Sequence, residues 1–231
     1  MTDALEELEG LEPRIAGAKR SQAFGDAAER ARGPVNQAPR HAALLETLVQ
    51  CAEDLDGLKD QTLRSRITAA IEKAESVGEV LKTAGTAEDL ENIATDYPAV
   101  SDALKNALER LKNHWSQLVA QDFADLAAVG HLLGAISGAE AIGAELVEIS
   151  SAARRLADGD PSADVLAETA PALRLRRSRT LDAMQAFTGE AEVDAFLSAV
   201  TRQEATLDLV TPKVLAWLTE KQALSAFRVR S

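Results

Sequence analysis

The chain has very few of the side chains that usually hold metals or act as nucleophiles. Its 231 residues include one cysteine and three histidines. A single cysteine excludes an intramolecular disulfide. No two of Cys51, His41, His114 and His131 are three or four residues apart, and neither CxxC nor HExxH occurs. We therefore expect no zinc or other transition-metal site.

Motifs for nucleotide, carboxylate-metal and acyl chemistry are also missing. The sequence has no GxxxxGK[ST], and the spaced glycines at 130–138 do not follow a predicted strand. A di-metal helical bundle needs Glu-x-x-His pairs, but the residues three before the histidines are Ala38, Leu111 and Ala128. No GxSxG or Ser-x-x-Lys elbow occurs in a strand-to-helix context. We predict that the protein is not an enzyme and uses no cofactor or small-molecule substrate.

Aromatic residues and long apolar runs are scarce as well. The chain has five Phe, two Trp and one Tyr, whereas Ala, Leu, Glu and Arg, which are strong helix formers, dominate every segment. The longest nearly uncharged run, Leu126 to Ala139, is shorter than the roughly 20 residues that cross a bilayer. The composition thus predicts an all-α fold with no membrane helix.

Basic residues are outnumbered by acidic ones, 25 to 37, and the deficit is uneven. Residues 1–150 carry 26 acids and 14 bases, and residues 151–231 carry 11 of each. An acidic surface argues against wrapping a nucleic-acid duplex. The chain opens without a basic segment followed by an apolar one, so we expect a cytoplasmic protein. The excess of arginine over lysine, with abundant alanine, is typical of a GC-rich bacterial genome.

The first 40 residues have few large apolar side chains. Residues 10–39 hold four glycines and three prolines, with only four larger apolar residues. Such a stretch makes a poor core element. We predict a first region, 1–40, that is a flexible arm with one short acidic helix at residues 3–10.

A second region, 41–137, contains two long apolar stripes at alternating spacings of four and three residues. The first predicts a helix over 41–83 that bends near Gly57 or Gly78, and the second predicts a helix over 98–136. The sequence Thr86-Ala-Glu-Asp resembles a capping box that opens a short helix, which should end before Pro98. We expect the two long helices to form an elongated antiparallel hairpin with coiled-coil character.

A third region, 138–231, is predicted to be a smaller helical bundle on which the hairpin packs. Its helices should cover residues 138–158, 161 to about 187, 190–204, and a last helix that begins at Pro212 after the capping Thr211. Trp217 in that last helix should be buried against the helix before it. Residues 173–176 and 227–230 alternate in polarity and leave a minimal two-stranded ribbon open as an alternative to helix at 173–176. The glycines at 130, 134 and 138 indicate a close helix crossing.

One cluster of basic residues stands out. Its members are Arg174, Arg176, Arg177 and Arg179. Arginine's planar fork suits a phosphate or carboxylate, so these residues are the candidate partner-binding site. The alternative is that they pair with acidic residues of the hairpin in the same molecule.

Long amphipathic helices without catalytic motifs favour an interaction role. The sequence predicts a non-catalytic α-helical scaffold that assembles with a protein partner or with itself. Two alternatives stay open: a nucleic-acid-binding accessory protein that uses Arg174–Arg179, and a regulatory subunit of a separately encoded motor or nuclease. Nucleic acid is possible but not favoured, because the net charge is −12.

Overall fold

The computed structural model describes residues 2–201 and 204–224, and helices are the only regular structure in them. Eight α-helices and two short 3-10 helices follow one another along these residues, which contain no strand. The predicted all-α class is therefore confirmed. The chain divides into two compact units, Met1–Leu111 and Lys112–Ser231.

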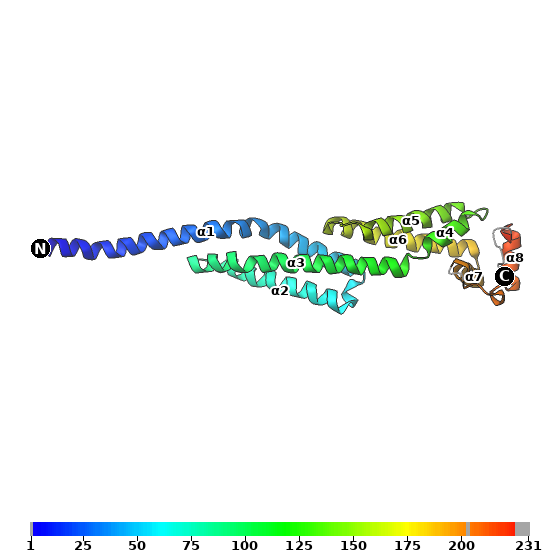
Figure 1. Ribbon diagram of the computed structural model, residues 1–231, viewed down its shortest axis with the longest axis horizontal. Coiled ribbons are helices and arrows are strands. Elements are labelled where there is room, and N and C mark those ends of the chain that lie inside the picture. Colours follow the sequence, from blue (N-terminus) through cyan, green and yellow to red (C-terminus); the bar gives the residue numbers. More distant parts are fainter. Residues whose placement is uncertain (1, 202–203, 225–231) are drawn as a thin grey trace. The chain divides into compact units, whose positions relative to one another are not determined.

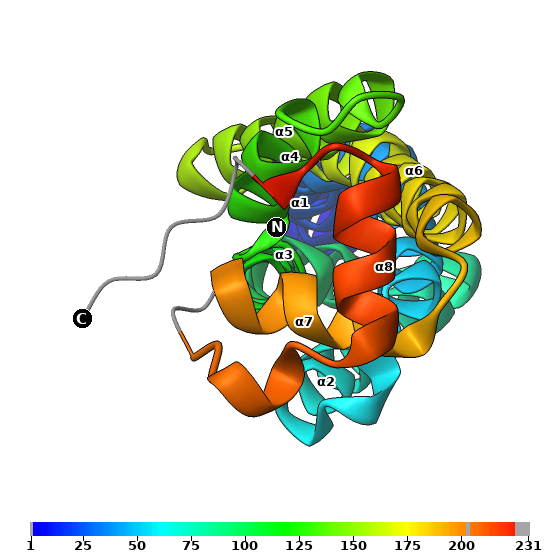
Figure 2. The same ribbon diagram turned by 90° about the vertical axis from the view of Figure 1, so that its right-hand side faces the viewer.

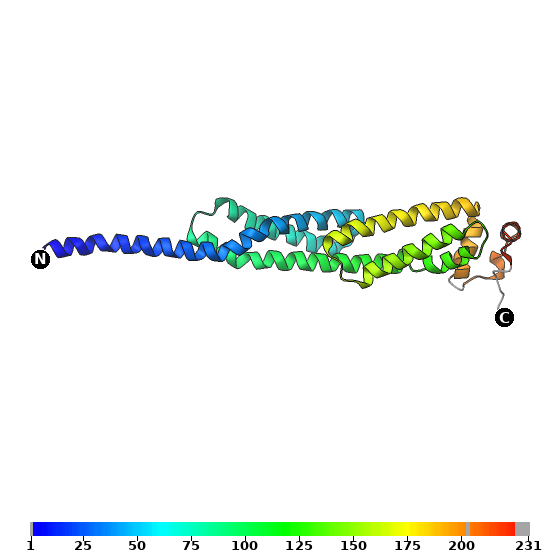
Figure 3. The same cartoon turned by 90° about the horizontal axis from the view of Figure 1, so that it is seen from above.

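Three helices form the first unit. They are α1 (Thr2–Asp54), which leads through the 3-10 helix η1 (Gly57–Lys59) into α2 (Gln61–Thr83), and the first part of α3 (Ala87–Asp122). α2 runs back along α1, and α3 reverses direction again, as the colours in Figures 1 and 3 show. The ion pair between Arg30 and Glu91 and the hydrogen bond between His41 and Tyr97 join α1 to α3 in a parallel register.

The predicted helix over 41–83 is interrupted near Gly57, one of the two positions where the sequence predicts a bend. The chain reverses direction there, between Leu55 and Asp60, so the prediction of one bent helix is wrong. Asp56 adopts a left-handed conformation with φ of 57°, and the Asp60 carboxylate then accepts hydrogen bonds from the amides of Thr62 and Leu63, at 2.8 and 3.2 Å. This N-cap starts α2 in a new direction. The antiparallel partner of α3 in this unit is therefore α2, whereas residues 41–54 run parallel to it.

The predicted helix end before Pro98 is also wrong. The capping box at Thr86 and Asp89 forms, with reciprocal hydrogen bonds of 3.2 and 2.9 Å, but the helix that it starts continues through Pro98 to Asp122. The buried Tyr97 ring stacks on His41, with centroids 5.4 Å apart. This packing keeps Tyr97 in the helix, although a residue that precedes a proline disfavours the helical conformation.

The predicted irregular arm over residues 10–39 is corrected as well, since α1 is helical throughout this range. From Ala27 onward the reason is packing. Ala27 and Ala31 are buried. Together with Pro34, Ala38 and His41 they form the stripe of α1 that faces the other helices. Alanines at spacings of four and three residues let helices approach closely without large side chains.

Five further helices complete the second unit with the last part of α3. They are α4 (Leu126–Gly134), α5 (Glu140–Asp158), α6 (Ala163–Thr188), α7 (Ala191–Thr201) and α8 (Pro212–Glu220), with the 3-10 helix η2 (Leu207–Leu209) before the last. α4 packs on α5, α5 packs on α6, and α7 contacts α4, α6 and α8. Figure 2 shows α7 and α8 crossing at a steep angle.

Most boundaries in this unit agree with the sequence predictions. The helix at 138–158 is confirmed as α5, and α6 is helical at 173–176, where the sequence also allows a ribbon. Thr211 caps α8, whose Trp217 is buried and edge-to-face with Phe187 at 6.0 Å. Ser162 caps α6, and its side chain accepts a hydrogen bond from the amide of Val165. Residues 227–230 lie outside the described residues.

The predicted continuous helix over 98–136 is wrong, because α3 ends at Asp122 and α4 starts at Leu126. Of the glycines at 130, 134 and 138, Gly130 has the predicted role of a close crossing, whereas a Cβ atom on Gly134 would meet nothing within 4 Å. A Cβ atom on Gly130 would lie 2.6 Å from the carbonyl oxygen of Gly143 on α5, and one on Gly143 would lie 2.5 Å from that of Gly130. The backbones of α4 and α5 therefore touch at this point.

Candidate interaction surfaces

Arg176, one of the four arginines singled out from the sequence, binds acidic residues of its own unit. Its Nε atom donates a hydrogen bond to Glu145 at 3.0 Å, and its Nη2 atom lies 3.3 Å from Glu148. The hydrogen bonds to these two carboxylates raise the pKa of the Arg176 guanidinium. Both partners belong to α5, so they are not in the region predicted to form the hairpin.

Arg177 stabilises the end of α3. Its Nε atom donates a hydrogen bond to the carbonyl oxygen of Asp122 at 2.8 Å, and its guanidinium lies 5.6 Å from the centre of the Phe123 ring. Two more side chains reach the next two carbonyl oxygens: Ser150 donates to Phe123 at 3.3 Å and Arg154 donates to Ala124 at 3.1 Å. Three consecutive carbonyls thus find donors on α5 and α6 at the helix end, where intrahelical partners run out.

The other two arginines of the cluster differ in their exposure to solvent. Arg174 is half-buried and Arg179 is exposed. The four side chains therefore do not form one basic face, since Arg176 and Arg177 are engaged with groups of the same unit. Their role in binding a partner stays a prediction.

His41 and Cys51 are placed for packing, whereas His131 is exposed. The Tyr97 hydroxyl oxygen lies 2.9 Å from Nδ1 of His41, and burial raises the pKa of Tyr97. Cys51 is fully buried, and burial together with the nearby Asp54 raises its pKa to about 12. Within the described part of the chain, no group of three His, Cys, Asp or Glu residues is placed to hold a metal ion.

None of the described helices combines the length and apolar character that a bilayer span requires.

The segment of α1 before Ala27 forms a candidate surface that the sequence prediction missed. Every residue from 17 to 26 is exposed, whereas Ala27 and Ala31 are almost completely buried. In Figures 1 and 3 this part of α1 extends beyond the ends of α2 and α3 that form the same unit. Phe24, with 45% of its surface exposed, is the large apolar side chain of the segment. The sequence prediction missed this surface because the glycines and prolines of the stretch predict an irregular arm. Without a helix, the exposed residues cannot be assigned to a common face.

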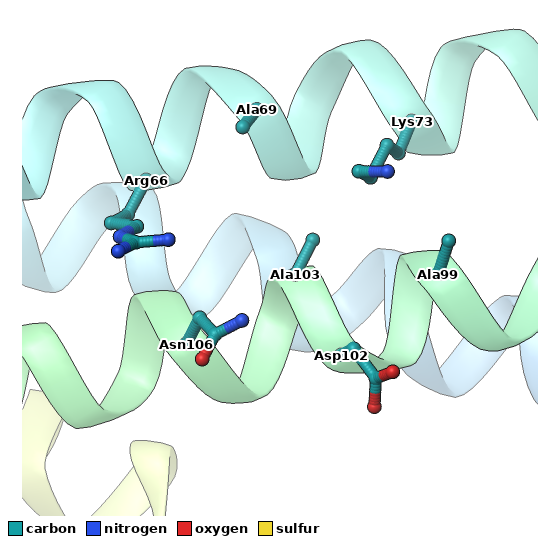
Figure 4. A pocket seen from close by; sticks show the side chains of 7 residues that line it. All are labelled: Arg66, Ala69, Lys73, Ala99, Asp102, Ala103 and Asn106. Carbon is teal, nitrogen blue, oxygen red and sulfur yellow. The ribbon is translucent and has the colours of Figure 1, made fainter.

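A second candidate surface is a hollow of about 290 Å³ between α2 and α3, shown in Figure 4. Its lining comprises Arg66, Ala69 and Lys73 from α2 and Ala99, Asp102, Ala103 and Asn106 from α3. The three alanines make an apolar floor, and the charged and amide side chains stand at its edges. Among the described residues, Arg66 and Lys73 have no carboxylate partner.

Comparisons of the chain with protein-family models, with curated proteins and with solved structures give no match. Function therefore has to be argued from the residues and surfaces of this molecule.

Proposed function

We propose that this chain is a non-catalytic α-helical interaction module whose amino-terminal part of α1 binds a protein partner. The observation that carries the proposal is the complete exposure of a ten-residue helical segment, 17–26, that ends in a buried stripe beginning at Ala27. We call residues 17–26 the free segment of α1.

The free segment has little reason to be helical on its own. Isolated helices shorter than about 12 to 15 residues are marginal in water, and most helical stability in proteins comes from packing one face. Gly17 and Gly25 each lower helix stability by about 1 kcal/mol relative to alanine, and a Cβ atom on either would meet nothing within 4 Å. Contact with another helix would supply the missing stabilisation.

The remaining chemistry of the chain supports a binding role rather than catalysis. The thiol of Cys51 is buried, and with a pKa of about 12 it stays protonated at neutral pH. The nucleic-acid alternative has less support than the protein-binding one. Arg176 and Arg177 already bind groups of the same unit, which limits their availability for phosphates.

Site-specific photo-crosslinking in the cells that produce the chain tests the proposal. A benzophenone amino acid replaces Gln22, which is exposed in the free segment, and in a matched control it replaces Ser178, which is exposed on α6. We expect an adduct of one defined mass from position 22 and none from position 178. If position 22 yields no adduct and the amides of 17–26 exchange as fast as those of an unfolded chain, the proposal is wrong.

A further inference from the structure

We propose that the free segment of α1 exchanges between the helix of the structure and an unwound form, and that the partner binds the helical form. The inference rests on the proposed function, because it describes how the same surface is regulated. Residues 17–26 continue the helix that is packed from Ala27 onward, so no new helix nucleus has to form. Their helical population therefore depends on how readily the packed helix extends toward the amino terminus.

Packing holds α1 in the helical form from Ala27 onward. Ala27 and Ala31 are each 1% exposed, and Arg30, which lies between them, forms an ion pair with Glu91 of α3. Unwinding of this part would expose the alanines and separate the two charges. Residues 17–26 are all exposed, so becoming helical buries little of their apolar surface within the chain. Packing thus fixes the helix after Ala27 but not before it.

Two glycines limit how far the helix extends on its own. Gly25 lies two residues before Ala27, and Gly17 is the first residue of the free segment. Glycine loses more conformational freedom on folding than any other residue, so each glycine favours the unwound form about two- to fivefold relative to alanine. A helix that extends from Ala27 toward the amino terminus therefore meets an unfavourable residue almost at once.

Glycine does not have this consequence within the packed part of α1. Gly33 is also exposed, and a Cβ atom on it would meet nothing within 4 Å, as at Gly17 and Gly25. However, Gly33 lies two residues after the buried Ala31, where unwinding would also expose the packed face of α1. The position of a glycine relative to Ala27 thus decides whether it permits unwinding.

Coupling between helix formation and binding has a measurable consequence. A partner that binds only the helical form has its affinity reduced by the fraction of chains in that form. The apparent affinity therefore rises when the helix becomes more populated, without any change in the contacts themselves. A rigid helix behaves differently, because its affinity changes only when the contacts change.

Hydrogen exchange of the purified full-length chain tests the two forms without a partner. At a concentration where sedimentation shows a monomer, the amides of 17–26 should exchange at least about a hundredfold faster than those of 41–54. Gly17→Ala/Gly25→Ala should slow them by at least about threefold, after correction for intrinsic rates. Gly33→Ala is the matched control and should leave these rates unchanged. Protection of 17–26 equal to that of 41–54 in the wild-type monomer would overturn the proposal.

Affinity for the protein captured at position 22 provides the second measurement. We expect its dissociation constant for the Gly17→Ala/Gly25→Ala chain to be at least about threefold lower than for wild type, and Gly33→Ala to match wild type. Equal or weaker binding of the double variant would overturn the coupling but leave the proposed function intact. No adduct from position 22, with amides that also exchange as fast as those of an unfolded chain, would instead overturn the proposed function.

Discussion

Gly130 of α4 and Gly143 of α5 meet so closely that neither position has room for a Cβ atom. A Cβ atom added at either position would lie 2.6 or 2.5 Å, respectively, from a backbone carbonyl oxygen of the facing helix. The crossing therefore requires glycine at both positions. At this point α4 packs on α5 through backbone contact rather than through interlocking side chains.

Replacing Gly143 with alanine should destabilise the second unit by about 1 to 3 kcal/mol, because the two helix backbones must move apart. Gly134→Ala is the matched control, since a Cβ atom there meets nothing within 4 Å. We expect that variant to be neutral or slightly more stable. Urea unfolding followed by circular dichroism measures both, and equal stabilities for the two variants would contradict the close crossing.

Arg177→Gln should lower the free energy of unfolding by about 1 to 3 kcal/mol, because it removes the hydrogen bond to the Asp122 carbonyl and the contact with Phe123. Arg179→Gln, at an exposed position of the same helix, should change it by less than about 0.5 kcal/mol. Thermal unfolding compares them.

Retention on nucleic acid tests the remaining role of the arginine cluster. We expect the wild-type chain not to bind single- or double-stranded nucleic acid at low salt. Retention that is lost when Arg174, Arg176, Arg177 and Arg179 are all changed to Gln, with a salt slope smaller by about one for each lost phosphate contact, would instead establish the nucleic-acid alternative.

The Asp60 cap should make the first unit sensitive to acid. Burial acts to raise the pKa of Asp60, but hydrogen bonds from the amides of Leu63 and Thr62 and the Arg110 guanidinium outweigh it and lower the pKa below its ordinary value of 3.8. A lowered pKa in the folded state means that the stabilisation is present at neutral pH and is lost as the pH falls through the folded value.

Asp60→Ala should therefore cost about 1 kcal/mol at pH 7, and the difference from wild type should narrow below about pH 4. Urea unfolding at pH 7, 5 and 3 measures this. A difference that stays constant over that range would show that the charge of Asp60 does not contribute to the cap.

Trp217→Ala should lower the free energy of unfolding by about 3 to 5 kcal/mol, because it empties a buried site next to Phe187. Near-ultraviolet circular dichroism and urea unfolding report the loss. A cost below 1 kcal/mol would mean that α8 does not contribute to the core of the second unit.

Sequence patterns predict the helical class, the caps at Thr86 and Thr211 and the close crossing at Gly130, because each depends on a few neighbouring residues or on composition. Patterns fail where tertiary contacts outweigh local preference. The buried Tyr97 carries α3 through Pro98, and alanines provide the packing of α1 that local patterns assign to larger apolar residues.

The candidate site is harder to predict than the fold. The arginine cluster is evident from its charge, but the sequence does not reveal that Arg177 binds the end of α3. The hollow between α2 and α3 is invisible in the sequence, because it is formed by alanines from two helices that come together only through the turn at 84–86. The sequence contains one indication of the free segment, because Phe24 is a large apolar residue in a stretch of small and charged ones. Its neighbours on the surface can be named only once the segment is known to be helical.

Hydrogen exchange of the amides in residues 17–26, followed by mass spectrometry on the full-length chain alone and with the partner captured from position 22, tests most directly whether a partner covers the free segment. The account predicts protection that approaches that of residues 41–54 when the partner is present and is lost when the partner is removed, while residues 41–54 stay protected throughout. Equal exchange at 17–26 with and without the partner would contradict it.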